Sequence, residues 1–275
     1  MRTRFAPSPT GPLHLGHAFS ALRAARLAGK LGGEFLLRIE DLDRARARPA
    51  WEDQIYDDLA WLGLTWPKPV LRQSERSGAY GAALDQLWDM GLLFPCTCSR
   101  RDIAAAASAP HEGDPPMGPD GIVYPGTCRD KPKPAQMPTG VLRLDMSRAV
   151  DGLSELTWNT PNGPQSKRAA DLICEVGDVV LTRLDMPAAY HLAVVVDDGA
   201  QGITHVVRGA DLEDATPIHV LLQRLLNLPT PIYHHHRLIR DESGKRLAKR
   251  NDARSISRYR SEGLQPREIW KMVGL

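Results

Sequence analysis

The sequence lacks the features that would place the protein in a membrane or outside the cell. No apolar run among its 275 residues approaches the length that crosses a bilayer, and residues 1–7 contain no hydrophobic core of a signal peptide. The four cysteines, in the reducing compartment that these absences indicate, argue against a disulfide framework, and repeats and low-complexity tracts are absent. We therefore expect a globular, cytoplasmic protein that has no membrane partner and keeps its thiols reduced.

An excess of charge is also missing, since the formal net charge is only +2. The charges are nevertheless distributed unevenly. Residues 1–33 contain five Lys or Arg and no acid, and residues 233–260 contain nine basic against three acidic residues. Such local excess favours focused attraction of phosphate groups over general binding of polyanions, and a basic surface without a ligand is the alternative.

The first part of the chain has an α/β pattern. A short strand at about 3–6, a helix at about 18–31 and a buried strand at 34–39 form a βαβ opening, and helices are expected at about 51–62 and 78–90. A βαβ unit implies a parallel sheet with its ligands at the carboxyl ends of the strands.

The composition changes between residues 92 and 184, where Pro and Gly are frequent and cysteines cluster. Strands at 191–198 and 203–208 and a helix at about 211–226 then resume the α/β pattern. We predict a Rossmann-type, doubly wound parallel sheet with a small inserted subdomain. The predicted catalytic domain comprises residues 1–91 and 185–240. The predicted insertion comprises residues 92–184, and residues 241–275 are expected to form a loop and a C-terminal helical segment.

Two distant segments indicate nucleotide chemistry. The first, residues 7–17 (PSPTGPLHLGH), places His14 and His17 at a strand-to-helix turn, where the backbone can approach phosphate and the helix N-terminus favours negative charge. The second, residues 244–250 (GKRLAKR), is a cation-rich loop suited to a leaving pyrophosphate. Either segment alone is weak support, because an ordinary turn or a solvated basic loop would look the same.

Three of the cysteines, Cys96, Cys98 and Cys128, lie close enough in sequence to suggest a metal site. Their spacing is less specific than paired Cys-X-X-Cys knuckles, so reduced core thiols are an equal alternative. Cys174, isolated in an apolar stretch, is expected to be an ordinary core residue.

Together, the segments at 7–17 and 244–250 resemble the two ATP-binding signatures of class I aminoacyl-tRNA synthetases. The phrase RFAPSPTG at 4–11, with LRIEDLD at 37–43, YHLAVVVDD at 190–198 and VRGADL at 207–212, resembles the catalytic domain of the glutamyl-tRNA synthetases of that class. The resemblance covers nearly the whole chain. It implies ATP as substrate with Mg²⁺ as activator, and catalytic roles for His14, His17 and Lys249. The implied ATP-binding residues are His14, Gly16, His17, Arg246, Leu247, Ala248, Lys249 and Arg250.

The same resemblance implies a glutamate pocket. Glutamate carries one ammonium and two carboxylates, so its pocket needs an anion and one or two cations, and arginine suits bidentate binding of a carboxylate. The sequence leaves open which arginine recognises the γ-carboxylate. It also leaves open the alternative that Glu40, Asp41 and Asp43 cap the next helix. Asp197 and Asp198 are interpreted as turn residues at the end of a strand. The implied pocket residues are Arg4, Phe5, Ala6, Pro7, Ser8, Glu40, Tyr190 and Arg208.

The resemblance further implies one structural Zn²⁺ bound by Cys96, Cys98, Tyr124 and Cys128. On chemical grounds alone His111 competes with Tyr124 for the fourth position, because imidazole is a far commoner zinc ligand.

Only 25 residues follow Arg250, too few for the anticodon-binding region of full synthetases. This short form is similar to the truncated paralogues that attach glutamate to the queuosine base of tRNA(Asp). It implies a monomer whose partner is the anticodon stem-loop of tRNA(Asp). The alternatives are a minimal glutamyl-tRNA synthetase that charges a tRNA 3′ end, and a non-catalytic zinc-containing RNA-binding protein.

Overall fold

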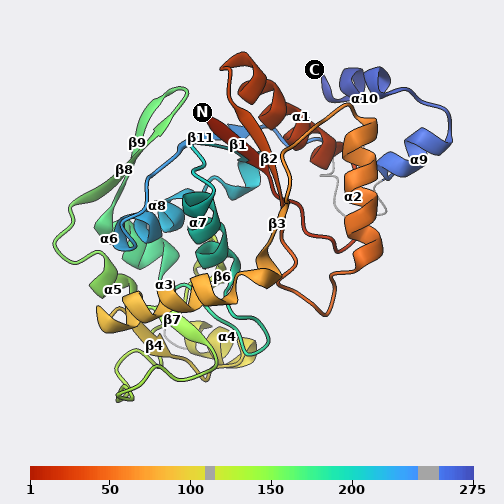
Figure 1. Ribbon diagram of the computed structural model, residues 1–275. Coiled ribbons are helices and arrows are strands. Elements are labelled where there is room, and N and C mark those ends of the chain that lie inside the picture. Colours follow the sequence, from red (N-terminus) through yellow and green to blue (C-terminus); the bar gives the residue numbers. More distant parts are fainter. Residues whose placement is uncertain (109–114, 241–253) are drawn as a thin grey trace. The chain divides into compact units, whose positions relative to one another are not determined.

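The computed structural model describes residues 1–108, 115–240 and 254–275 (Figure 1). The chain divides into two compact units. The first contains residues 1–75, 202–213 and 231–275, and the second contains residues 76–201 and 214–230. Each unit is therefore assembled from segments that lie far apart in the sequence.

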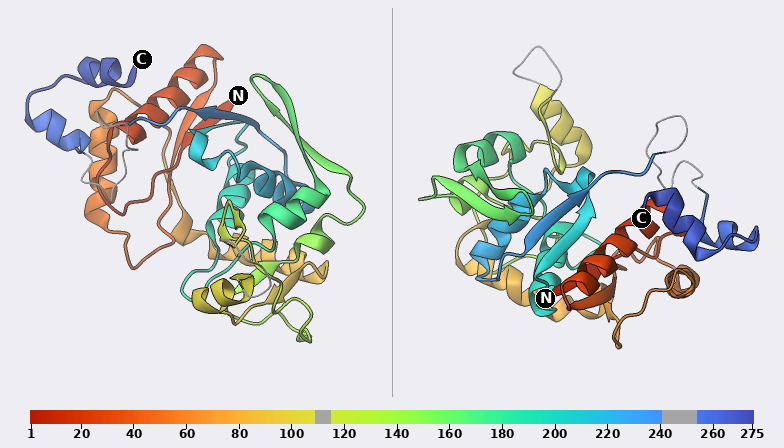
Figure 2. Two further views of the ribbon diagram at one scale, coloured as in Figure 1. Left: turned by 180° about the vertical axis from the view of Figure 1, so that it is seen from behind. Right: turned by 90° about the horizontal axis from the view of Figure 1, so that it is seen from above.

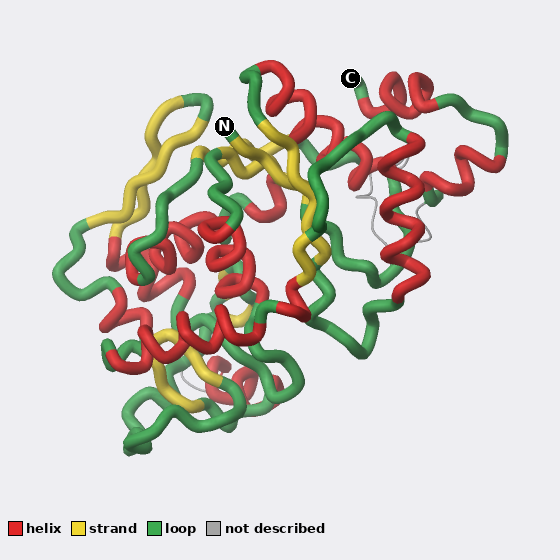
Figure 3. The backbone as a smooth tube through the Cα atoms, in the orientation of Figure 1, coloured by secondary structure: helices red, strands yellow, loops and turns green. Residues whose placement is uncertain are grey.

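Five short strands form the centre of the first unit, in two parallel sets with the orders β1-β2-β3 and β10-β11. They are β1 (Arg2–Phe5), β2 (Glu34–Ile39), β3 (Leu71–Arg72), β10 (His205–Gly209) and β11 (Ile232–His236). The residue before β10, Thr204, accepts a hydrogen bond at Oγ1 from the Arg2 amide (2.8 Å), so β10 lies beside β1. Figure 3 draws the strands in yellow. Because β2 and β10 flank β1 on opposite sides, this is the kind of switch point at which doubly wound sheets bind ligands.

Helix α1 (Leu15–Lys30) packs on this sheet through a stripe of Ala, Leu and Phe at helical spacing. The C-terminal helices α9 (Ile256–Ser261) and α10 (Pro266–Val273) pack on α2 (Pro49–Trp61) and α1 respectively (Figures 1 and 2). Ile269 and Val273 of α10 are fully buried in the same core as α1. Two 3₁₀ turns complete the unit, η1 (Gln73–Glu75) and η3 (Ala210–Leu212).

The second unit combines helices with three antiparallel strand pairs, β4–β7, β5–β6 and β8–β9. Its helices are α3 (Ser77–Asp89), α4 (Arg100–Ser108), α5 (Met146–Ala149), α6 (Ala169–Asp171), the π-helical turn η2 (Leu172–Val176), α7 (Tyr190–Ala200) and α8 (Thr216–Leu225). Its strands are β4 (Leu93–Pro95), β5 (Met117–Gly118), β6 (Gly121–Ile122), β7 (Leu142–Leu144), β8 (Glu155–Thr160) and β9 (Gly163–Arg168).

One predicted strand is wrong, because residues 191–198 belong to helix α7. Their run of valines is compatible with either structure, and α7 is a helix that packs on both α3 and α8 and is buried on most of its surface. Asp197, interpreted from the sequence as a turn residue, is fully buried within this helix and accepts hydrogen bonds from Tyr80 Oη (2.7 Å) and Arg76 Nε (3.1 Å). Tertiary packing therefore outweighs the strand preference of valine here.

The predicted α/β class with a parallel sheet is confirmed. The expected first strand and the helices at 18–31, 51–62 and 78–90 agree with β1, α1, α2 and α3 within a few residues, and the strand at 34–39 coincides with β2. The domain boundaries proposed from the sequence stay a prediction. None of the helices described in this chain is long and apolar enough to cross a membrane.

Candidate active site and cysteine cluster

A cavity of about 400 Å³ opens at the carboxyl ends of β1 and β2 in the first unit. It brings together six of the residues predicted for the active site, and Thr10, Asp43 and Arg46 complete its lining. The six predicted residues are Phe5, Ala6, Pro7, Ser8, His17 and Glu40. The Glu40 amide donates to the Pro7 carbonyl at 3.0 Å, which joins the two strand ends.

His14 and His17 cap the helix that begins beside this cavity. His14 is the N-cap of α1, and its Nδ1 accepts a hydrogen bond from the Gly16 amide at 3.1 Å. His17 Nδ1 accepts from the His14 amide at 3.2 Å, and the two rings stack with centroids 3.8 Å apart. Because both Nδ1 atoms are acceptors, each neutral ring carries its proton on Nε2 and can donate it to an anion.

Gly16 makes this stacked turn possible. A Cβ at Gly16 would lie 2.9 Å from the His14 ring. A larger residue would therefore displace the ring that caps α1, which explains the choice of glycine between the two histidines.

Glu40 is paired with a cation that sequence reasoning missed. Arg38 of β2 is fully buried, and its Nη2 lies 3.3 Å from Glu40 Oε1. Residues i and i+2 of a strand face the same side, so an arginine within an apolar strand two residues before a glutamate was the signal that could have revealed this pair.

The acidic residues after Glu40 do not cap the next helix as the alternative interpretation proposed. Asp43 Oδ1 accepts from the Arg46 amide (3.2 Å), and Asp41 accepts from the Ser74 amide (2.8 Å), whereas α2 begins after Arg48 without a side-chain cap. The hydrogen bond and the charge of Arg46 lower the pKa of Asp43.

Both predicted pocket arginines are buried on neighbouring strands, Arg4 in β1 and Arg208 in β10. Neither is among the residues that line the cavity in the described part of the chain. Arg208 Nε donates to Nε2 of His235 at 3.1 Å, and its guanidinium lies 5.1 Å from the centre of the Tyr233 ring. Burial, reinforced by the charge of Arg208, lowers the pKa of His235 to about 4, so this imidazole is neutral and accepts the hydrogen bond.

Tyr190, the remaining predicted pocket residue, begins α7 in the second unit and is 37% exposed. Its ring packs on the edges of His191 and His219, at centroid distances of 5.4 and 5.6 Å. His191 Nδ1 and His219 Nε2 are hydrogen bonded at 3.0 Å, and His191 Nε2 lies 3.8 Å from an Asp120 carboxylate oxygen. Within the second unit, this polar cluster fixes the orientation of the tyrosine ring.

The predicted Lys249, with Arg246, Leu247, Ala248 and Arg250, lies outside the described residues. The chain just beyond them is joined to the histidine turn, because Ser255 forms an antiparallel bridge with His14 and the Ile256 amide donates to the Leu13 carbonyl at 2.8 Å.

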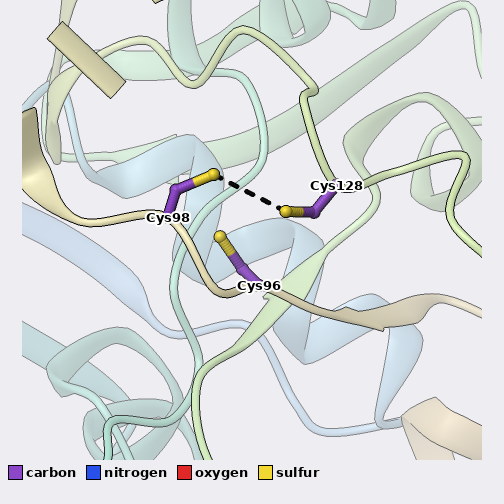
Figure 4. A group of neighbouring side chains, drawn as sticks. All are labelled: Cys96, Cys98 and Cys128. Atoms are coloured by element: carbon purple, nitrogen blue, oxygen red, sulfur yellow. Dashed lines mark hydrogen bonds between the residues drawn. The ribbon is translucent and has the colours of Figure 1, made fainter. Parts of the chain in front are cut away.

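Cys96, Cys98 and Cys128 converge in the second unit, with all three sulfur atoms within 4.8 Å of one another (Figure 4). The Sγ atoms of Cys98 and Cys128 are 3.5 Å apart, and the Tyr124 hydroxyl lies 3.5 Å from Cys96 Sγ and 3.4 Å from Cys98 Sγ. Tyr124 is buried at the same place, and His111 lies outside the described residues. Cys174 is exposed, so its assignment to the core was wrong.

The cluster favours thiolate at one of its cysteines. Burial opposes ionisation of Cys128, but hydrogen bonds from Tyr124, the Thr97 backbone, Cys98 and Lys131 outweigh it and lower its pKa to about 6. Burial raises the pKa of the Cys98 thiol, and burial with hydrogen bonds to the cysteines raises the pKa of Tyr124. The Cys128 thiol therefore loses its proton readily, which favours binding of a divalent cation that prefers sulfur.

Comparison with known proteins identifies the family to which this fold and site belong. The family described as "tRNA synthetases class I (E and Q), catalytic domain" matches residues 1–118 and 164–275. The chain therefore belongs to the class I tRNA synthetases of the E and Q type through their catalytic domain.

Individual relatives within that family carry a narrower name than the family itself. A protein from Rhodobacter capsulatus named "Glutamyl-Q tRNA(Asp) synthetase" is 60% identical over the full length of both chains. A Geobacter sulfurreducens protein of the same name is 44% identical, over 92% of this chain and 77% of the relative. Among solved structures, a glutamate tRNA ligase from Elizabethkingia meningosepticum in complex with its amino acid matches with a TM-score of 0.79 at 28% identity, and this chain spans 60% of it.

Proposed function

We propose that the protein is a ligase that activates glutamate with ATP and transfers it to the queuosine base in the anticodon loop of tRNA(Asp). The observation that carries the proposal is the cavity at the ends of β1 and β2, where Ser8, His17 and Glu40 meet beside the N-terminus of α1. The relative of that name, 60% identical from end to end, supports the choice of acceptor.

Activation requires attack of the α-carboxylate of glutamate on the α-phosphate of ATP, with pyrophosphate leaving in line. Such a reaction depends on positioning and charge stabilisation and needs no side-chain nucleophile. The Nε2 protons of His14 and His17 would supply donors for the phosphates, and the positive end of the α1 dipole would favour their charge. Lys249 and its neighbours Arg246, Leu247, Ala248 and Arg250 would stabilise the leaving pyrophosphate. Mg²⁺ bound to ATP adds further charge neutralisation.

Glutamate selection rests on opposite charges at the two ends of the substrate. Glu40, oriented by Arg38, would bind the ammonium group of glutamate, and Arg4 and Arg208 would bind its carboxylates. A buried guanidinium without a carboxylate partner would disfavour glutamine, because an unpaired buried charge costs more than a lost neutral contact. Ser8 would add a hydroxyl group, and Phe5, Ala6 and Pro7 the pocket wall.

The cysteine cluster fits one structural Zn²⁺. Ligands at about 2.3 Å for sulfur and about 2.1 Å for oxygen in a tetrahedral site lie roughly 3.5 to 3.8 Å apart, close to the separations among Cys98, Cys128 and the Tyr124 hydroxyl. Zinc bound by Cys96, Cys98, Tyr124 and Cys128 would cross-link the segment after β4 to the segment before β7. With four protein ligands it leaves no position for a substrate, so its role is structural.

The decisive experiment compares tRNA(Asp) with and without queuosine as acceptors of labelled glutamate, using protein, ATP and Mg²⁺. We expect incorporation only into the modified tRNA, and nearly as well into its isolated anticodon stem-loop. Mild periodate cleavage of the queuosine diol, with the terminal ribose blocked beforehand, should abolish it. Glutamate on the terminal adenosine of tRNA(Glu) would instead identify a minimal glutamyl-tRNA synthetase, and no ATP–pyrophosphate exchange would identify a non-catalytic RNA-binding protein. A monomeric state and a cytoplasmic location are part of the proposal, testable by light scattering and fractionation.

A further inference from the structure

Two further cavities in the first unit share no residue with the candidate active site. The cationic pocket, about 210 Å³, is lined by Arg23, Arg26 and Lys30 of α1 and by His234 of β11. The apolar pocket, about 520 Å³, is lined by Leu22, Ala25, Leu64 and Trp270. Arg26 and Leu275 line both pockets, so the two are joined.

The cationic pocket gathers three like charges on one helix. Arg23, Arg26 and Lys30 are exposed and share one face of α1 at helical spacing, and no acidic side chain lines either pocket. In the described part of the chain, Arg26 and Lys30 make no ion pair. Because like charges on one helix face repel one another, a bound anion would stabilise this face.

His234, which lines the same pocket, also carries a buried polar atom. Its Nε2 is buried and has no hydrogen-bond partner in the described structure. Burial, followed by the neighbouring His205 and Arg23, lowers the pKa of His234 to about 4, so the ring is neutral. A neutral imidazole can donate one hydrogen bond to an anion and thereby satisfy a polar group that otherwise costs free energy in the interior.

Trp270 gives the adjoining apolar pocket an aromatic surface. It lies on α10, remains 37% exposed, and faces a wall formed by Leu22, Ala25 and Leu64. Exposed aromatic rings beside a row of cations are the arrangement by which proteins bind single-stranded nucleic acid, with bases on the rings and phosphates on the cations.

We propose that the joined pockets form a second RNA-binding site, which holds phosphates at Arg23, Arg26 and Lys30 and a base against Trp270. The cations extend over seven residues of α1, or about 10 Å, which matches successive phosphates better than a single one. The site rests on the proposed RNA substrate and adds a contact outside the catalytic cavity, where the reacting base would enter.

Salt dependence of tRNA binding tests the cationic half. Fluorescence anisotropy with labelled tRNA(Asp) at about 50 to 200 mM salt gives the negative slope of log K against log salt. The magnitude of this slope decreases by about 0.7 for each lost single-strand phosphate contact. The triple variant Arg23→Gln, Arg26→Gln and Lys30→Gln should flatten the slope by about 2. The matched control, Lys68→Gln, Arg168→Gln and Arg224→Gln, removes the same charge from exposed positions outside both pockets and should leave the slope nearly unchanged.

Trp270 tests the aromatic half. Trp270→Leu keeps an apolar side chain but removes the stacking surface, and should weaken tRNA binding about tenfold while leaving the salt slope unchanged. Thermal unfolding of each variant checks that it is folded.

Equal slopes for the triple variant and its control would overturn the proposal, and so would an unchanged affinity of Trp270→Leu for tRNA. Full displacement of tRNA by millimolar AMP would also overturn it, because that result would indicate a site for free nucleotides. Parallel glutamylation assays separate the two hypotheses. A slope difference without transfer to queuosine refutes the proposed acceptor alone, and transfer without a slope difference refutes this site alone.

Discussion

Replacement of Glu40 by glutamine tests the proposed glutamate pocket with the smallest change in shape. Glutamine keeps an oxygen that Arg38 Nη2, now 3.3 Å from Oε1, can approach, but removes the charge that would bind the substrate ammonium. A hydrogen bond to a charged group contributes about 1.5 to 3 kcal/mol, so Glu40→Gln should raise the KM for glutamate about 10- to 100-fold. ATP–pyrophosphate exchange at varied glutamate concentrations measures this effect.

Asp43→Asn is the matched control for Glu40→Gln. Asp43 lines the same cavity and is also a carboxylate, but it is paired with the exposed Arg46, and exposed pairs contribute only about 0 to 1 kcal/mol. The KM for glutamate should therefore change little. If Glu40→Gln leaves the KM within about twofold of the wild type, or if both variants raise it equally, the assignment of the ammonium site to Glu40 is refuted.

Three further predictions concern substrate, metal and pH. Arg208→Ala should lower glutamate activation at least about a hundredfold because a charge-assisted contact is lost, and exchange rates with glutamine equal to those with glutamate would contradict the pocket. Cys128→Ser, or removal of metal by a chelator, should lower the thermal unfolding midpoint before it abolishes ATP binding; metal analysis that finds almost no zinc in carefully purified protein would exclude the site. Asp58, buried in α2, has a pKa raised by burial from 3.8 to about 7 despite the charge of Arg260. The folded state therefore keeps its proton longer than the unfolded state, and stability is lost as pH rises from about 4 to about 7. Asp58→Asn should be more stable than the wild type at about pH 8 and gain nothing below about pH 4, and equal differences in unfolding free energy at both values would disprove the link to ionisation.

The sequence predicts the opening of the fold because it depends on local patterns. Strand β2 and the turn before α1 are marked by an apolar run and by glycine and proline, which put Ser8 and Glu40 just after strands and His17 in the first turn of α1. The family resemblance then supplied the candidate site residues, and six of them line one cavity at the carboxyl ends of β1 and β2, where parallel sheets bind ligands.

The errors arise where packing between distant segments decides the structure. Residues 191–198 have the composition of a strand, but contacts with α3 and α8 select a helix, and only those contacts explain the burial of Asp197. Cys174 lies in an apolar stretch yet is exposed in a π-helical turn. Such outcomes depend on partners that no local pattern specifies.

The division of the first unit among three segments bears on how the chain matures during synthesis. Strand β11 and helix α10, whose Ile269 and Val273 complete the core beneath α1, come from the final segment, residues 231–275. At the usual rates of translation, the earlier strands wait many seconds for these partners. Until then α1 and β1 expose apolar surface, so the nascent chain should depend on chaperones for longer than one whose core forms from consecutive residues.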